Sequence, residues 1–163
     1  MSKEPFNLKY STWQLIWLVT LRVIVGWYFL YEGMVKVINP NWSSVSYLLD
    51  SSGIFKGVFY DLASNPQILK LVDFLNMWGL IAIGTGLILG AFTRLALWSG
   101  IVLLGFYYLS HPPLLGLSYA MPMEGSNLIV NKVLIELMVM IVLLLFPTSR
   151  VIGLDRFILI RKR

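Results

Sequence analysis

Long apolar stretches separated by shorter polar connections dominate the chain. A stretch of about 20 mainly apolar residues is long enough to cross a bilayer as a helix. Four stretches predict such helices, at about residues 13–38, 68–92, 95–110 and 128–146. We therefore predict an all-α integral membrane protein, built as one domain over residues 1–163 around a bundle of four transmembrane helices.

The connection over residues 39–67 is long for a helical bundle. Apolar residues recur at helical spacing in both of its halves, at Trp42, Val45 and Leu49 and then at Phe55, Phe59 and Leu62. This spacing predicts two short amphipathic helices, which we expect to lie on the outer face of the membrane.

Basic residues lie mostly on one side of the four predicted spans. That side holds Lys3, Lys9, Arg94, Arg150, Arg156, Arg161, Lys162 and Arg163. The opposite connections, residues 39–67 and 112–127, contain Lys56 alone. Because cytoplasmic segments carry the excess of Lys and Arg, we predict that both termini are cytoplasmic. The basic segment that follows the fourth span is expected to lie on anionic lipid.

The composition agrees with a membrane protein and limits its chemistry. The chain is 58% hydrophobic and 13% charged, against roughly 25% charged residues in soluble domains. It contains no cysteine and a single histidine. Thiolate-ligated zinc, Cys-ligated iron–sulfur clusters and multi-histidine metal sites within one chain are therefore excluded, and we predict no metal site.

Charged residues interrupt the first and fourth predicted spans. Arg22, Gly26, Phe29, Gly33 and Lys36 fall on one stripe of the first helix. The two small glycines on that stripe should allow another helix to approach closely. The second span has a further pair, Gly86 and Gly90, at the spacing that favours close helix packing.

Two pairs of opposite charge stand one helical turn apart. Glu32 precedes Lys36 in the first span, and Lys132 precedes Glu136 in the fourth. Counting the helical rise from each end of the bilayer places Arg22 and Glu136 near the middle, which predicts a contact between them. The same count places Glu32 and Lys132 in a shared outer layer.

Each of these charges opposes membrane insertion by about 2.5–3.5 kcal/mol, so its presence in a span requires an explanation. One reading is an interhelical clamp that sets the register of the bundle. The other is a polar pocket or proton path that opens outward. Its candidate residues are Glu32, Lys36, His111, Asn131, Lys132 and Glu136.

Three segments together resemble a known family: LRVIVGWYFLYEGMVKVINPNW, then HPP, then EGSNLIVNKVLIE. They are similar to the DoxX family of small bacterial membrane proteins, in particular its DoxD-like subunits of thiosulfate:quinone oxidoreductase. The resemblance covers about residues 21–146. It implies a four-helix bundle in the bacterial cytoplasmic membrane, electron transfer from a small sulfur compound to membrane quinone, and a second small subunit.

Quinone reduction requires an apolar slot, donors to the ring oxygens and a source of protons. We expect Lys132, Asn131 and Tyr31 to donate hydrogen bonds, and Glu32 or Glu136 to pass protons. The candidate catalytic residues are thus Glu32, His111, Lys132 and Glu136, and the candidate quinone-binding residues are Arg22, Tyr31, Lys36 and Asn131.

An anion such as thiosulfate is expected near Lys36, His111 and Lys132 on the outer face. Because the chain lacks a flavin motif, a haem ligand pair and cysteine, electrons must pass directly between bound substrates or come from a partner. We expect membrane lipid and a second small subunit or another copy of the chain as partners, and no nucleic acid.

The alternative is a scaffold, an accessory protein or a small-solute binding protein. In that case the buried charges only fix the helix bundle. A quinone bound between the first and fourth spans would distinguish the two functions.

Overall fold

The computed structural model describes residues 10–114, 119–120 and 128–160, and the side chains within these ranges up to residue 157. The described part is all-helical and has no β-strand. Its elements are α1 (Thr12–Ile38), α2 (Val45–Leu49), α3 (Lys56–Ser64), α4 (Pro66–Leu89), α5 (Thr93–Ser110), α6 (Lys132–Leu145), the 3₁₀ turn η1 (Thr148–Arg150) and α7 (Asp155–Ile160). Of the residues used above, Lys3, Lys9, Arg161, Lys162 and Arg163 lie outside the described residues.

All four predicted spans contain a long helix, and two of these are long and apolar enough to cross a membrane. These two are α1 and α4. Helix α5 has 18 residues and α6 has 14. At 1.5 Å per residue α6 is about 21 Å long, which is less than the roughly 30 Å of a hydrocarbon core.

The start of α6 corrects the predicted span 128–146. Leu128 has a left-handed backbone with φ of 62°. Asn131 then caps the helix, because its side-chain oxygen accepts a hydrogen bond from the Leu134 amide at 2.9 Å. The helix therefore begins at Lys132, although the three residues from Leu128 to Val130 are as apolar as the helix itself.

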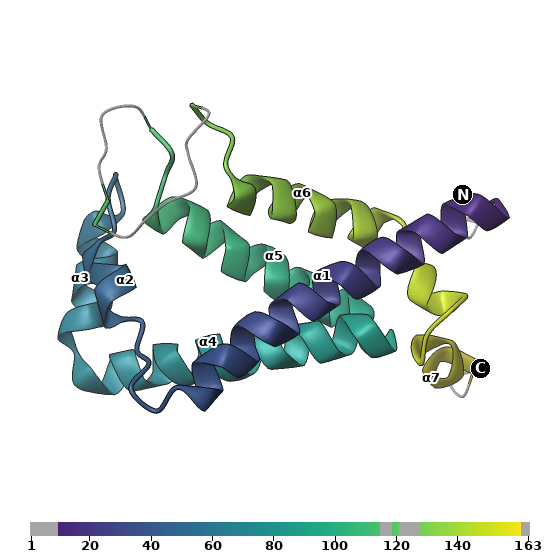
Figure 1. The fold of residues 1–163 in the computed structure, drawn as a ribbon, viewed down its shortest axis with the longest axis horizontal. Coiled ribbons are helices and arrows are strands. Elements are labelled where there is room, and N and C mark those ends of the chain that lie inside the picture. The colour runs from purple at the N-terminus through teal and green to yellow at the C-terminus, as the bar shows by residue number, and fades with distance from the viewer. Residues whose placement is uncertain (1–9, 115–118, 121–127, 161–163) are drawn as a thin grey trace, which may run out of the picture.

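The long helices run lengthwise through the molecule, with α1 crossing α5 in this view, and leave two distinct ends (Figure 1). Helix α1 packs along α4, and α5 packs against both α4 and α6. The start of α1 and helix α7 lie at one end, which we name the terminal end, while α2 and α3 lie at the other, the loop end (Figure 1). The two short helices predicted between residues 39 and 67 are confirmed.

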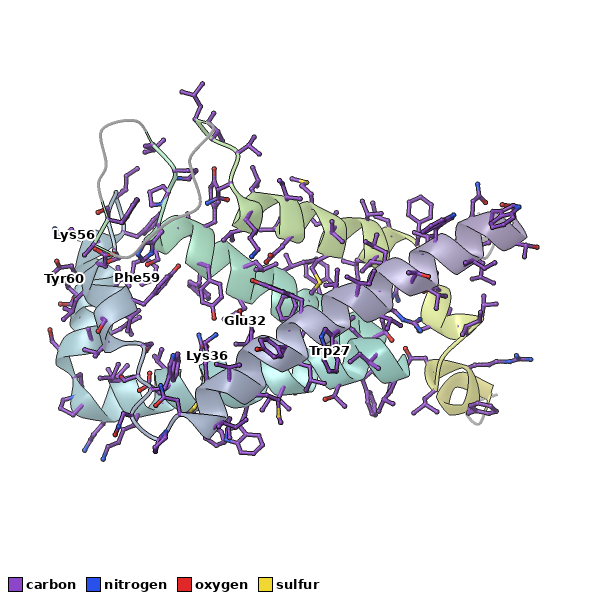
Figure 2. The ribbon with its side chains drawn as sticks, viewed as in Figure 1. Trp27, Glu32, Lys36, Lys56, Phe59 and Tyr60 are labelled. Carbon is purple, nitrogen blue, oxygen red and sulfur yellow. The ribbon has the colours of Figure 1, made fainter. Side chains whose placement is uncertain are left out.

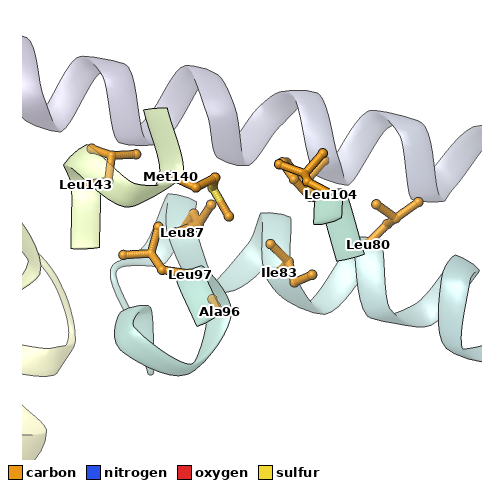
Figure 3. Packing of buried hydrophobic residues seen from close by; sticks show 9 residues of the cluster. Leu80, Ile83, Leu87, Ala96, Leu97, Leu104, Met140 and Leu143 are labelled. Carbon is orange, nitrogen blue, oxygen red and sulfur yellow. The ribbon is translucent and has the colours of Figure 1, made fainter. Parts of the chain in front are cut away.

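Buried apolar side chains from the four long helices form one core (Figure 3). Leu87 and Met140 have no exposed surface, and Leu97 is 1% exposed. The other members are Phe29, Leu80, Ile83, Ala96, Leu104 and Leu143. At about 25 cal/mol per Å² of apolar surface removed from water, such side chains each contribute roughly 1.5–3 kcal/mol in an aqueous reference.

Glycines allow the backbones of α1 and α4 to touch. A Cβ added at Gly26 would lie 3.0 Å from the Gly84 carbonyl oxygen, and one at Gly33 would lie 2.9 Å from the Ile81 amide. A Cβ added at Gly84 would collide with the Leu30 amide. The predicted close approach at Gly26 and Gly33 is thus confirmed, and Gly84 is its counterpart on α4.

The predicted pair Gly86 and Gly90 divides into two roles. Gly90 ends α4 in the left-handed conformation, with φ of 64°. A Cβ added there would lie 2.7 Å from the Gly153 Cα, so Gly90 permits a tight turn with the C-terminal segment packed on it. A Cβ added at Gly86 would lie 3.3 Å from the Ala96 Cβ of α5. The predicted close helix packing therefore holds at Gly86 and not at Gly90.

The C-terminal segment is attached to the bundle by Arg22 and Asp155. Arg22 is 3% exposed and donates hydrogen bonds to the Thr148 hydroxyl at 3.1 Å and the Ile152 carbonyl at 2.8 Å. Asp155 accepts from the amides of Phe92 and Thr93 at the start of α5, at 2.7 and 3.1 Å. Burial acts to raise the pKa of Asp155, but these and other hydrogen bonds outweigh it and hold the pKa below its usual value.

The outer surface of α1 is apolar. Trp17, Ile24 and Trp27 are 67%, 60% and 61% exposed. Figure 2 labels Trp27 on this helix. Large contiguous apolar surfaces are rare on soluble monomers, so the exposed faces of α1 and α4 fit a membrane protein.

The contact at Gly84 can be tested against a glycine with free space on the same helix. We expect Gly84→Ala to destabilise the fold by about 1–3 kcal/mol, because the methyl group must push the α1 backbone away. Gly79→Ala should be neutral or stabilise by up to about 1 kcal/mol, since a Cβ at Gly79 meets nothing within 4 Å. Thermal unfolding in detergent measures both, and equal midpoints for the two variants would contradict the contact.

Candidate functional site

Four charged side chains from α1 and α6 meet around one small cavity of about 80 Å³. Glu32 and Lys36 come from α1, and Lys132 and Glu136 from the first turns of α6. Its other lining residues are Tyr28, Phe29, Leu80, Leu104, Tyr107 and Val133. We name this the charged cavity. All four long helices contribute to it.

The helical spacing explains which side chains reach the charged cavity. Tyr28, Glu32 and Lys36 follow one another at intervals of four residues, so they form a row along α1. Figure 2 shows Glu32 and Lys36 on the side of α1 that faces α5. Lys132 and Glu136 form the matching row on α6, which begins at Lys132 because Asn131 caps it.

The charges of this cavity balance one another. Lys36 Nζ lies 3.3 Å from a Glu32 carboxylate oxygen. Lys132 Nζ lies 5.1 Å from the centroid of the Tyr28 ring, a cation–π distance. Glu32, Glu136 and Lys132 all act electrostatically on the Tyr28 hydroxyl. Because two carboxylates lie beside two ammonium groups, the cavity has no net charge and attracts an anionic ligand only weakly.

The charged cavity is close to the surface. The side chain of Glu32 is 43% exposed and that of Lys36 is 17% exposed. Lys132 is exposed as well. These charged groups are therefore not sealed inside the bundle.

Arg22 lies elsewhere, which corrects the predicted contact between Arg22 and Glu136. Arg22 bonds the C-terminal segment at the terminal end of the bundle, while Glu136 lines the charged cavity with Tyr28 and Glu32. The depth count failed because α6 starts four residues later than predicted, which moves Glu136 about 6 Å toward the loop end.

Two of the predicted quinone donors do not line the charged cavity. Tyr31 is 58% exposed on the outside of α1, and Tyr28 lies at the cavity instead. Asn131 is buried, and its side-chain oxygen is occupied as the helix cap of α6.

His111 belongs to a separate cluster at the loop end. It is 4% exposed, and its Nδ1 lies 3.0 Å from the Ser110 hydroxyl. Its Nε2 lies 3.8 Å from an Asp50 carboxylate oxygen. Its ring packs between those of Tyr47 and Tyr119, with centroids 4.0 and 4.8 Å away. The anion site predicted from Lys36, His111 and Lys132 is thus divided between two places.

A larger cavity that the sequence did not predict lies between α4, α5 and the two short helices. Its volume is about 710 Å³, and most of its wall is apolar. Phe59 of α3 closes it at the loop end, while the exposed Trp98 and Phe106 of α5 border its side. We name it the apolar cavity. Its size falls within the range of roughly 300–1,000 Å³ that is usual for small-molecule sites.

Few polar groups line the apolar cavity. Most of them lie near the loop end, and Ser99 lies farther along α5. The Asn76 amide donates to the Tyr107 hydroxyl at 2.6 Å. The Tyr47 hydroxyl donates to the Tyr107 carbonyl at 3.4 Å, and burial raises the pKa of Tyr47 far above its usual value. Ser110 follows Tyr107 by one turn of α5 and is 1% exposed.

Tyr107 lines both cavities. Its hydroxyl bonds Asn76 at the wall of the apolar cavity, and Glu32 and Tyr28 act on it electrostatically from the charged cavity. The sequence offered one signal for this arrangement, an amide at Asn76 in a mainly apolar span. Its neighbour Asp73 binds the connection before α2, since it accepts from the amide of Ser44 at 2.8 Å.

Among the described residues, no group of three or more His, Cys, Asp or Glu side chains is placed to hold a metal ion. Comparisons of the chain with protein-family models, curated proteins and solved structures found no match.

Proposed function

We propose that the protein is a four-span protein of the bacterial cytoplasmic membrane that binds a quinone in the apolar cavity, as a subunit of a quinone-linked oxidoreductase. The observation that supports this most is the shared wall at Tyr107, because it joins an apolar cavity of ligand size to ionisable groups that are open to water. A quinone site needs both: apolar walls for the ring and tail, and a proton supply for the oxygens.

The residues of the apolar cavity fit a quinone. Aromatic and aliphatic side chains form most of its wall, and its exposed border at Trp98 and Phe106 would admit a ligand directly from the lipid. Asn76, Tyr107 and Ser110 supply hydrogen-bonding groups at one end, where a ring oxygen would lie. The opposite end offers room for an apolar tail.

The bound quinone would accept two electrons and two protons to become a quinol. Tyr107 would donate one proton to a ring oxygen and be reprotonated from Glu32 across the charged cavity. The electrons would come from a small sulfur compound, for example two thiosulfate ions that lose one electron each and join through a new S–S bond. Because the charged cavity has no excess of cations, we assign the sulfur compound to a partner subunit rather than to this cavity.

A non-catalytic role is the second candidate, and one observation favours it. The four charged side chains of the charged cavity sum to zero and connect α1 with α6, two helices that otherwise make little contact. Such a cluster would stabilise the bundle even without any ligand.

The proposed topology predicts that both ends of the chain face the cytoplasm. A reporter active only in the cytoplasm should work when fused after Arg163, and a reporter active only outside should work when inserted after Ser64, at the end of α3. Activity in the reverse pattern would contradict the orientation.

The proposed ligand predicts saturable binding of decylubiquinone to the purified protein, measured by quenching of tryptophan fluorescence with Trp98 at the wall. Gly79→Leu should weaken this binding at least about tenfold, the equivalent of 1.4 kcal/mol, because the new side chain fills the apolar cavity. Gly105→Leu is the matched control: a Cβ meets nothing within 4 Å at either glycine, and Gly105 lies away from the cavity. Equal affinity in both variants would place the ligand elsewhere.

Lys132→Met distinguishes the proton path from the clamp, because methionine keeps an apolar stem but removes the charge and its three donors. If the charged cavity supplies protons, quinone reduction in membranes that contain the partner subunit should fall roughly a hundredfold per folded molecule. If it is only a clamp, the unfolding midpoint should fall while the folded fraction retains wild-type activity. Lys70→Met, an exposed residue of α4, controls for the loss of a surface charge.

A further inference from the structure

We propose that Ser110, His111 and Asp50 form a proton relay between the apolar cavity and the surface at the loop end. This inference rests on the proposed function, since it supplies the second proton of the quinone bound there. It assigns the single histidine of the chain to proton transfer, separate from the charged cavity.

The three groups follow one another from the cavity outward. Ser110 lines the apolar cavity, and its hydroxyl lies 3.0 Å from His111 Nδ1. The other ring nitrogen, Nε2, lies 3.8 Å from an Asp50 oxygen. One water or a small side-chain shift would close this gap. The Asp50 side chain is 14% exposed, so it reaches solvent.

The imidazole is held in place for such a transfer. Tyr47 and Tyr119 stack on its two sides, and the Tyr119 hydroxyl donates to the Pro112 carbonyl at 2.7 Å. Asp50 is held too, because its other oxygen accepts from the Ala120 amide at 2.9 Å. Within the described residues, His111 Nε2 makes no hydrogen bond of its own. A buried ring nitrogen that makes no hydrogen bond to the protein usually either has a function or binds a water molecule.

The protonation state agrees with a relay. Burial lowers the pKa of His111 below its usual value, and the opposing effect of Asp50 does not reverse this. The imidazole is therefore neutral at pH 7 and can exist in two tautomers. The titratable groups facing it are Asp50, Tyr47 and Tyr119, and burial raises the pKa of both tyrosines, so neither tyrosine competes for the proton at neutral pH.

One transfer moves a single proton through the relay and reverses the direction of each hydrogen bond in the relay. Before it, Asp50 has taken up a proton from the solvent and donates it to Nε2, the Nδ1 hydrogen points to Ser110, and the Ser110 hydrogen points to a ligand oxygen. After it, Asp50 is ionised, Nε2 holds the hydrogen, and the Ser110 hydrogen points to Nδ1. One proton has left Asp50 and one has joined the ligand oxygen. The two electrons come from the sulfur compound of the proposed function.

Because His111 is the only histidine in the chain, its tautomer can be observed directly. Protein labelled with ¹⁵N-histidine gives one pair of ring nitrogen signals, recorded in detergent at pH 7.5 with either decylubiquinone or, under anaerobic conditions, decylubiquinol. We expect the hydrogen on Nδ1 with decylubiquinone and on Nε2 with decylubiquinol. In Ser110→Ala, recorded at ligand concentrations raised to saturation, both ligands should give the same tautomer.

Asp50→Asn provides a second readout, with Asp61→Asn as the matched control. Asp61 is an exposed carboxylate of α3 at the same end of the protein. Because the Asp50 carboxylate favours the charged imidazole, Asp50→Asn should lower the pKa of His111 measured by titrating the same signals, and Asp61→Asn should leave it unchanged. Circular dichroism and monodispersity verify that each variant is folded.

The outcomes separate the relay from the proposed function. If decylubiquinone fails to quench tryptophan fluorescence in the wild type, the quinone site itself is wrong. If both ligands bind but give the same tautomer, the relay is wrong and the quinone site stands. A switch that persists in folded Ser110→Ala would equally overturn the path through Ser110.

Discussion

The close contact between α1 and α4 determines how most of the other groups are placed. Gly26 and Gly84 bring the two backbones together, so α1 cannot rotate without a collision. At about 100° per residue, Tyr28 and Glu32 lie roughly 160° and 120° around α1 from Gly26. The glycines thus direct one face of α1 to α4 and, as a consequence, direct the row of polar side chains toward α5 and α6.

The helices themselves could be predicted from the sequence because hydropathy and spacing determine them locally. The glycine face of α1 could also be predicted, since it follows from the helical period alone. The start of α6 could not, because hydropathy does not distinguish Val130 from the helix that follows. The backbone turn at Leu128 and the cap at Asn131 set that start, and the error moved the predicted depth of Glu136 with it.

The polar partners were harder to predict because they depend on segments that are distant in sequence. Arg22 is separated from Ile152 by 130 residues, and the segment that contains Ile152 was expected to lie on lipid. The apolar cavity depends on how α3 packs over α4 and α5, which periodicity does not specify. Only Asn76 gave a local signal, since an amide in an apolar span needs a partner.

The charges in the first and fourth spans raised the question of why a membrane span contains them, and their position in the structure changes the answer. An insertion cost of about 2.5–3.5 kcal/mol applies to a charge at mid-membrane, whereas Lys132 is the exposed first residue of α6 and Glu32 lies in the last two turns of α1 with a side chain that is 43% exposed. Their presence alone therefore does not require a function. The groups that need explanation are neutral and more deeply buried: the Asn76–Tyr107 hydrogen bond and the contact of Ser110 with His111, which line or adjoin an apolar cavity. Apolar side chains could pack a lipid-facing wall there without any unmet hydrogen bond. A polar ligand oxygen at this end of the cavity would accept from these groups, and for that reason we propose the apolar cavity, rather than the charged one, as the binding site.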